Sequence, residues 1–216
     1  MSSLLELQPS VRAPAAQERA ALERRAWLLA WAGNAWHLAE FGVAVGAGIA
    51  AGSVALLGFG LDSAIEVAAA GVIAGLFSGG RGSSHAAERR AQQLIALSYA
   101  ALVLYIGVEA SRDLLGTHRP AVSWVGVGLA AVTAPTMPLL ARTKRRLGMA
   151  LGSSAAVSEA AQNQLCAYLS VALLAGLLAN ALAGWWWADP VAALGIAAVA
   201  AREAVASWRG DSCDCC

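Results

Sequence analysis

The stretch SVALLGFGLDSAIEVAAAGVIAGLF, from Ser53 to Phe77, decides the fold class of this 216-residue chain. It is apolar throughout except for two carboxylates, Asp62 and Glu66. A helix needs about 20 such residues to cross the hydrocarbon core of a bilayer. Ionisable groups at that depth cost about 2.5–3.5 kcal/mol each on insertion scales, so they are rare and usually functional. We therefore expect a transmembrane helix that contains a functional acidic pair.

The composition of the whole chain supports the same fold class. It is 58% hydrophobic and only 13% charged, with a mean hydropathy of +0.59, whereas soluble domains carry about 25% charged residues. We predict an all-α, polytopic integral membrane protein with six transmembrane helices. The predicted segments are Trp27–Gly48, Ser53–Phe77, Leu94–Ala110, Ala121–Ala141, Ala160–Ala183 and Pro190–Ser207. The third is the shortest and could extend into residues 86–93, and Asp189 is the expected N-cap of the sixth.

The basic residues predict the orientation of these segments. In a six-segment topology all of the 15 lysines and arginines except Arg112 and Arg119 fall on one side. The positive-inside rule then makes both termini cytoplasmic, and we expect the cell (plasma) membrane as the location. The chain divides into a cytoplasmic segment (1–25), a six-helix transmembrane domain (26–208) and a short Cys-rich cytoplasmic tail (209–216). The basic clusters lack interleaved aromatic residues, which argues against nucleic-acid binding.

The acidic pair is the expected centre of function. Asp62 and Glu66 are one turn apart on the same helix face, and they repel unless a proton or a cation lies between them. No lysine or arginine occurs in the interior of a predicted span to neutralise them. The fifth segment supplies Gln162 and Cys166 on one face at a similar depth. We predict a metal site of Asp62, Glu66, Cys166 and, as a weak ligand, Gln162.

Further polar residues of the spans are candidates for the cation path or for hydrogen bonds to the ligands. These are Asn34, His37 and Glu40 on one face of the first segment, and Asn163 on the fifth. Packing between helices would explain Asn34 equally well. Glu40 is harder to explain by packing, because a lone carboxylate in a span is costly.

The C-terminal tail carries Cys213, Cys215 and Cys216, a compact group of soft ligands. These thiols could capture a thiophilic metal before transport. The alternative is a disordered tail with accessible thiols.

Three stretches together resemble the cation diffusion facilitator family. Ala51–Glu66 is similar to its first loop and second helix, where Gly-Ser is followed by Asp-Ser-x-x-Asp/Glu. Ser84–Arg89 loosely resembles its Gly-His-x-x-x-Glu entry to the third helix, and Gly184–Leu194 resembles its fifth-to-sixth connection. The pattern is most similar to a divergent, compact branch that includes a vesicular zinc transporter. We expect the family's cytoplasmic C-terminal domain to be absent.

The resemblance implies metal efflux by proton antiport, with Zn²⁺ as the leading cargo, in a homodimer without a prosthetic group. Asp62 and Glu66 match the second-helix half of the family's transport site. The fifth-helix half is usually His-x-x-x-Asp, and here Gln162 and Cys166 occupy those places. The alternative is a non-transporting membrane partner that keeps the fold but has lost a full metal site. An enzyme is least favoured, because no Ser/His/Asp set, catalytic zinc helix or phosphate loop is visible.

Overall fold

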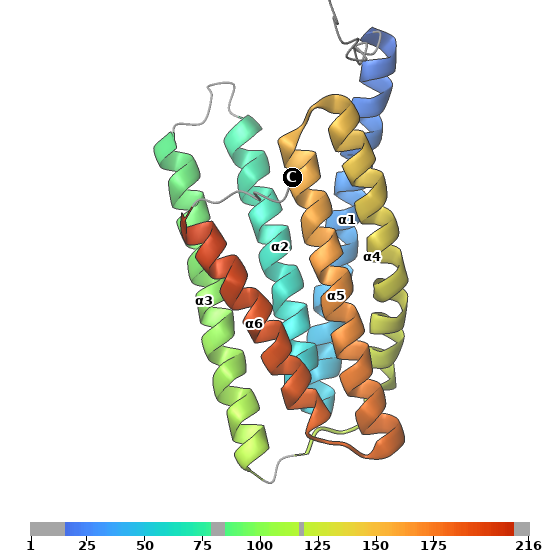
Figure 1. Ribbon diagram of the computed structural model, residues 1–216, viewed down its shortest axis with the longest axis vertical. Helices are drawn as coiled ribbons and strands as arrows, with labels where there is room; N and C mark the ends of the chain where they lie inside the picture. The colour runs from blue at the N-terminus through green and yellow to red at the C-terminus, as the bar shows by residue number, and fades with distance from the viewer. Residues whose placement is uncertain (1–15, 79–84, 117–118, 210–216) are drawn as a thin grey trace, which may run out of the picture.

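The computed structural model describes residues 16–78, 85–116 and 119–209. Its elements are α1 (Ala16–Ala51), α2 (Val54–Ser78), α3 (His85–Leu115), α4 (Trp124–Leu151), α5 (Ser154–Ala183) and α6 (Ala188–Arg209). The helices run side by side in one bundle, with α3 and α6 on one flank and α1 and α4 on the other (Figure 1). The predicted all-α fold is confirmed.

Five helices, α2 to α6, contain a stretch that is long and apolar enough to cross a membrane. The helix α1 is not among them, because Asn34, His37 and Glu40 interrupt its apolar middle. A membrane-type helical bundle is therefore confirmed for five segments, and the crossing of α1 stays a prediction. The helices are also longer than predicted: α3 begins at His85 and α4 continues to Leu151.

The α1–α2 and α4–α5 hairpins are built alike, at an offset of 100 residues. The turns are Gly52–Ser53 and Gly152–Ser153, and both glycines are left-handed, with φ of 62° and 65°. Each serine caps the next helix through its hydroxyl. Each serine N–H also donates to a carbonyl five residues back, that of Gly48 (3.0 Å) or Gly148 (2.9 Å). The two turns thus share the same capping hydrogen bonds.

The two hairpins have opposite directions in the bundle. The α1–α2 turn lies beside the α3–α4 connection, where the Ala121 N–H donates to the Ala51 carbonyl (2.8 Å). The α4–α5 turn lies at the other end (Figure 1). The α1–α2 and α4–α5 hairpins are therefore related as an inverted-topology repeat, an arrangement common in secondary transporters. Sequence reasoning missed its signal, the pattern Gly-x-x-x-Gly-Ser at 48–53 and again at 148–153.

Asp189 connects the beginnings of α2 and α6. The prediction that it caps its own helix is wrong, because α6 begins at Ala188 and Asp189 lies within its first turn. The carboxylate is fully buried and caps α2 instead. It accepts hydrogen bonds from the Ser53 hydroxyl (2.5 Å) and from the Ala55 backbone N–H (3.3 Å). The Asp-Pro element of the fifth-to-sixth connection thus fixes α6 against α2.

Replacing Asp189 with alanine should lower the free energy of unfolding by about 2–3 kcal/mol, because a buried hydroxyl and a helix N-terminus both lose their acceptor. The Asp189→Asn variant, which keeps one acceptor oxygen, should lose less. Thermal unfolding in detergent, followed by circular dichroism, measures both. Glu109→Gln, at an exposed pair with Arg112, is the control, and an alanine variant as stable as that control would contradict the role of Asp189.

Candidate metal centre

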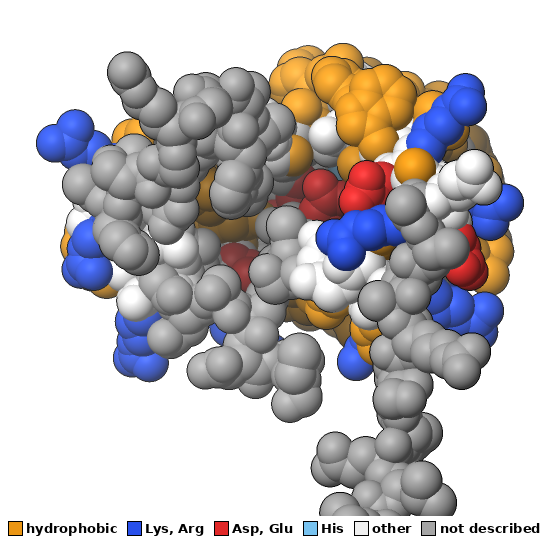
Figure 2. All heavy atoms as spheres, turned by 90° about the horizontal axis from the view of Figure 1, so that it is seen from above, with side chains coloured by type: hydrophobic (Ala, Val, Ile, Leu, Met, Phe, Trp, Pro, Cys, Tyr) orange, Lys and Arg blue, Asp and Glu red, His pale blue; other side chains and the backbone are white. Residues whose placement is uncertain are grey.

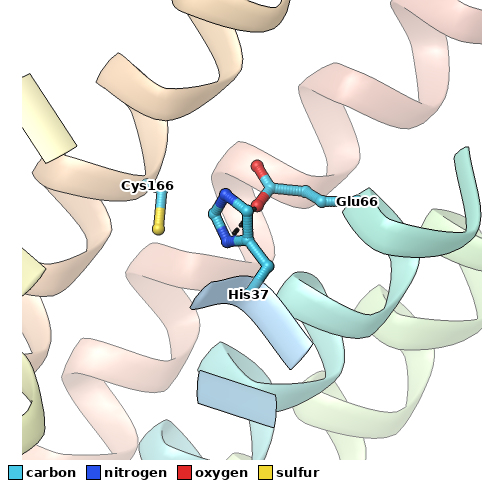
Figure 3. Close-up of side chains that lie close together, drawn as sticks. All are labelled: His37, Glu66 and Cys166. Atoms are coloured by element: carbon cyan, nitrogen blue, oxygen red, sulfur yellow. Dashed lines mark ion pairs between the residues drawn. The ribbon is translucent and has the colours of Figure 1, made fainter. Parts of the chain in front are cut away.

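Three buried side chains from three helices converge in the middle of the bundle: His37 of α1, Glu66 of α2 and Cys166 of α5. One potential ligand atom from each lies within 4.8 Å of the other two. Figure 3 shows the imidazole between the Glu66 carboxylate and the Cys166 thiol. His37 Nδ1 lies 3.1 Å from Glu66 Oε2. A nitrogen, an oxygen and a sulfur donor therefore face one point.

The carboxylate of Glu40 positions the imidazole and reaches three other helices. Its Oε2 lies 3.1 Å from His37 Nδ1, and it accepts a hydrogen bond from the Ser63 hydroxyl of α2 (3.3 Å). The same oxygen has a long contact with the Cys166 thiol (3.9 Å). Its Oε1 accepts from the Thr133 hydroxyl of α4 (2.6 Å). Glu40 is 1% exposed, and these contacts offset part of the cost of burying its carboxylate.

Asn163 completes the surroundings of the imidazole from α5. Its amide nitrogen lies 3.2 Å from His37 Nε2 and 3.3 Å from the Met137 sulfur of α4. Both nitrogens of the ring thus have a neighbour that fixes its orientation. Contacts of this kind fix the orientation of a histidine ring beside a metal.

Two buried oxygen atoms of this cluster have no hydrogen-bond donor among the described residues: Oε2 of Glu66 and Oδ1 of Asn163. The Glu66 oxygen lies 3.1 Å from His37 Nδ1, but the two atoms form no hydrogen bond. A buried acceptor without a donor costs about 1–3 kcal/mol, so native proteins rarely leave one unsatisfied. Two such oxygens beside one imidazole are suited to a bound cation.

The donor spacing can be compared with the geometry of zinc. Tetrahedral Zn²⁺ has bonds of about 2.0–2.3 Å, so its ligand atoms lie about 3.3–3.8 Å apart. The three donors here are within 4.8 Å of one another, so small side-chain movements would complete the coordination. Imidazole and thiolate favour zinc and softer ions over Mg²⁺ or Ca²⁺. The chemistry of the set is therefore that of a transition-metal or zinc site.

The structure brings together only part of the predicted metal set. Glu66 and Cys166 belong to the three-residue group of histidine, cysteine and carboxylate ligands, whereas Asp62 does not. Asp62 is buried one turn earlier on α2 and interacts electrostatically with Glu203 of α6 and with Glu40. Gln162 is only partly buried.

The remaining sequence candidates have different places. His37, expected on the path or beside the ligands, lies in the group itself, and Glu40 and Asn163 contact it. Asn34 is partly buried outside the group. The tail thiols Cys213, Cys215 and Cys216 lie outside the described residues. Sequence reasoning missed Ser63, Thr133 and Met137, whose only signal is a helical spacing that places Thr133 and Met137 on one face.

The sequence places Lys144 in the loop after the fourth predicted segment, and the structure places it within a helix. Because α4 continues to Leu151, Lys144 falls within a helix and is buried, 7% exposed. Its ammonium pairs with the Glu159 carboxylate of α5 at 3.1 Å. Figure 2 shows this end of the bundle: it is hollowed near its centre, acidic side chains are visible in the hollow, and lysines and arginines are spread around its edge.

Comparisons with known proteins add no assignment. No protein-family model matches the chain, and no curated protein matches it significantly in sequence. The fold and the cluster by themselves define a class: a helical bundle of membrane type with a buried His/Glu/Cys group at its centre.

Proposed function

We propose that this protein is a transporter of divalent metal cations, with zinc as the leading cargo, and that it exchanges the metal for protons. The observation that carries the proposal is the buried group of His37, Glu66 and Cys166, in which Glu66 Oε2 and the neighbouring Asn163 Oδ1 have no donor among the residues that the structure describes. Such a group in the middle of a membrane-type bundle is costly unless it binds something. The resemblance to cation diffusion facilitators points to the same activity.

The proposed topology has six spans and both termini in the cytoplasm of a cell whose plasma membrane holds the protein. The repeat supports a crossing by α1, because its counterpart α4 is long and apolar enough to span. Exposed indoles also support it. They occur near both ends of the bundle, at Trp27, Trp31 and Trp208 and at Trp124, Trp185 and Trp187. Indoles favour the two interfaces of a bilayer, and Trp27 precedes the end of α1 by about 36 Å of helix.

Proton exchange follows from the contacts of the imidazole. His37 Nδ1 lies 3.1 Å from a carboxylate oxygen of both Glu40 and Glu66. The contact with Glu40 is a hydrogen bond, so a proton lies between these two atoms. A metal that binds Nδ1 must displace that proton, because metal ligands have to be deprotonated. Metal binding and proton release are thereby coupled at one atom.

The test is zinc uptake into reconstituted vesicles that carry a pH gradient and an internal zinc dye. Wild-type flux should follow the gradient and stop when an ionophore collapses it. Glu66→Gln and Asp62→Ala should reduce the flux to that of protein-free vesicles. Glu109→Gln, which removes a partly exposed carboxylate near the end of α3, is the matched control and should transport normally. Equal flux in wild type and Glu66→Gln would overturn the proposal.

A non-transporting membrane partner is the second candidate. The residues Gln162 and Cys166 favour it, because they stand where the resembled family usually has a histidine and an aspartate, and an amide is a weak ligand for zinc. It would bind zinc without flux and would associate stably with itself or with another membrane protein. The mass of the purified assembly in mild detergent, with and without zinc, distinguishes the two candidates when combined with the flux measurement. The homodimer implied by the family resemblance is tested by the same mass.

A further inference from the structure

The pair formed by Lys144 and Glu159 lies on the same helix faces as the metal centre. Lys144 is seven residues from Met137 on α4, and Glu159 is seven residues from Cys166 on α5. Seven residues are about two turns, so each pair of positions shares a face. The ion pair is therefore displaced from the centre by about 10 Å along the bundle, toward the end that holds the α4–α5 turn.

The helix α1 packs against the Lys144 side chain at Gly33. A Cβ atom at position 33 would lie 2.9 Å from Lys144 Nζ and 3.6 Å from its Cε. Only glycine lets the ammonium lie this close to α1. Gly33 is also four residues before His37, on the same face. The buried ammonium of Lys144 thus lies between α1, α4 and α5, one to two helical turns from the proposed metal ligands.

We propose that the ion pair of Lys144 and Glu159 is a gate, which closes the path between the metal centre and the end of the bundle with the α4–α5 turn. This inference rests on the proposed transport function. An ion that approaches the centre from that end must displace the ammonium. Lys144 also interacts electrostatically with Glu66, so metal and ammonium compete for the same negative charge.

The inverted repeat supplies a contrast that supports an ionic gate at one end only. The positions that correspond to Lys144 and Glu159 hold Ala44 and Phe59, and both are fully buried. The opposite end of the path is therefore closed by apolar packing. An apolar closure has no charge with which a cation could compete, whereas an ionic closure can open when a cation arrives. The two ends would thus respond differently to the cargo.

The reaction rate of Cys166 with a thiol reagent tests the gate in the absence of metal. Full-length protein in detergent, with Cys213, Cys215 and Cys216 changed to serine, keeps Cys166 as its only cysteine. The cationic reagent 2-(trimethylammonium)ethyl methanethiosulfonate should react about three- to tenfold faster in Lys144→Met, equivalent to about 0.6–1.4 kcal/mol. The expected effect is modest because Glu159 is 37% exposed. Removing the ammonium also weakens the repulsion of the cationic reagent, whereas removing the Glu159 carboxylate weakens its attraction, so a rate increase in both variants reports access.

Two further variants complete the experiment. Glu159→Gln should raise the rate similarly, and the double variant should add little, because both changes break the same pair. Arg112→Met, which breaks an exposed pair at the opposite end, should leave the rate unchanged. Unchanged rates in Glu159→Gln and Lys144→Met would overturn the gate, and Glu159→Gln decides alone if Lys144→Met does not fold. Protection of Cys166 by added zinc is a separate measurement. If zinc protects Cys166 in no variant, the metal centre is contradicted, whereas the gate is judged by the rates measured without metal.

Discussion

Replacing His37 with alanine should weaken zinc binding to the solubilised protein on the order of 100-fold. Four-ligand zinc sites hold the ion with about 10–16 kcal/mol, so one ligand is worth about 3 kcal/mol. His37 is also the ligand in contact with both neighbouring carboxylates, because its Nδ1 lies 3.1 Å from an oxygen of Glu40 and 3.1 Å from an oxygen of Glu66. Competition with a zinc-binding dye at fixed pH measures the affinity.

The neighbouring Asn34→Ala variant is the control for this experiment. Asn34 is on the same helix, three residues before His37, but it is only partly buried and lies outside the ligand group. Its removal should change the affinity less than about threefold, as expected for a change outside the direct contacts. Loss of binding in Asp62→Ala, together with normal binding in His37→Ala, would show that the site is the acidic pair of α2 and not the three-helix group.

The sequence was sufficient to predict the helices and two of the three central residues. Glu66 and Cys166 are conspicuous, because a carboxylate in a long apolar run is costly and a thiol at the same depth is a plausible ligand. Their partner was assigned a secondary role. Whether His37 is a ligand or an outer contact depends on how α1 is rotated against α2 and α5, and helical periodicity alone does not determine that rotation.

Lys144 and Asp189 illustrate a second limit. Both lie near the ends of apolar runs, where hydropathy predicts a water-facing loop. Lys144 is buried because α4 continues past its apolar part, and glycine at position 33 of α1 makes room for the ammonium. Asp189 is buried because it caps α2, which is distant in sequence. Sequence patterns describe a residue's own helix, whereas these two side chains are determined by other helices.

Replacing Cys166 with aspartate should reverse the metal preference of the centre. The wild-type set of imidazole, thiolate and carboxylate favours soft or borderline ions such as Cd²⁺ and Zn²⁺, whereas carboxylates favour hard ions such as Mn²⁺. We expect the ratio of the Mn²⁺ and Cd²⁺ dissociation constants to fall on the order of 100-fold, the effect of one ligand. The substitution also restores a carboxylate at the place where the resembled family usually has one.

Cobalt reports the same change by its spectrum. Co²⁺ bound to the wild type should show sulfur-to-cobalt charge transfer in the near ultraviolet, and the Cys166→Asp protein should lose this band but keep the visible bands of a bound ion. Cys166→Ser, which is nearly isosteric, is the control: it should lose affinity for Cd²⁺ without gaining affinity for Mn²⁺. An unchanged cadmium preference in Cys166→Asp would show that the thiol is a packing residue.

The same substitution should make the stability of the bundle depend on metal. The Cys166 sulfur lies 3.9 Å from Glu40 Oε2 and close to Glu66, so an aspartate there adds a third negative charge to a buried site. Like charges at this distance repel strongly in a medium from which water is excluded. The metal-free variant should therefore unfold at a lower temperature than the wild type. Mn²⁺ should raise the unfolding temperature of the variant again, because it binds only the folded state. A variant that is equally stable with and without Mn²⁺ would mean that no cation enters between these three side chains.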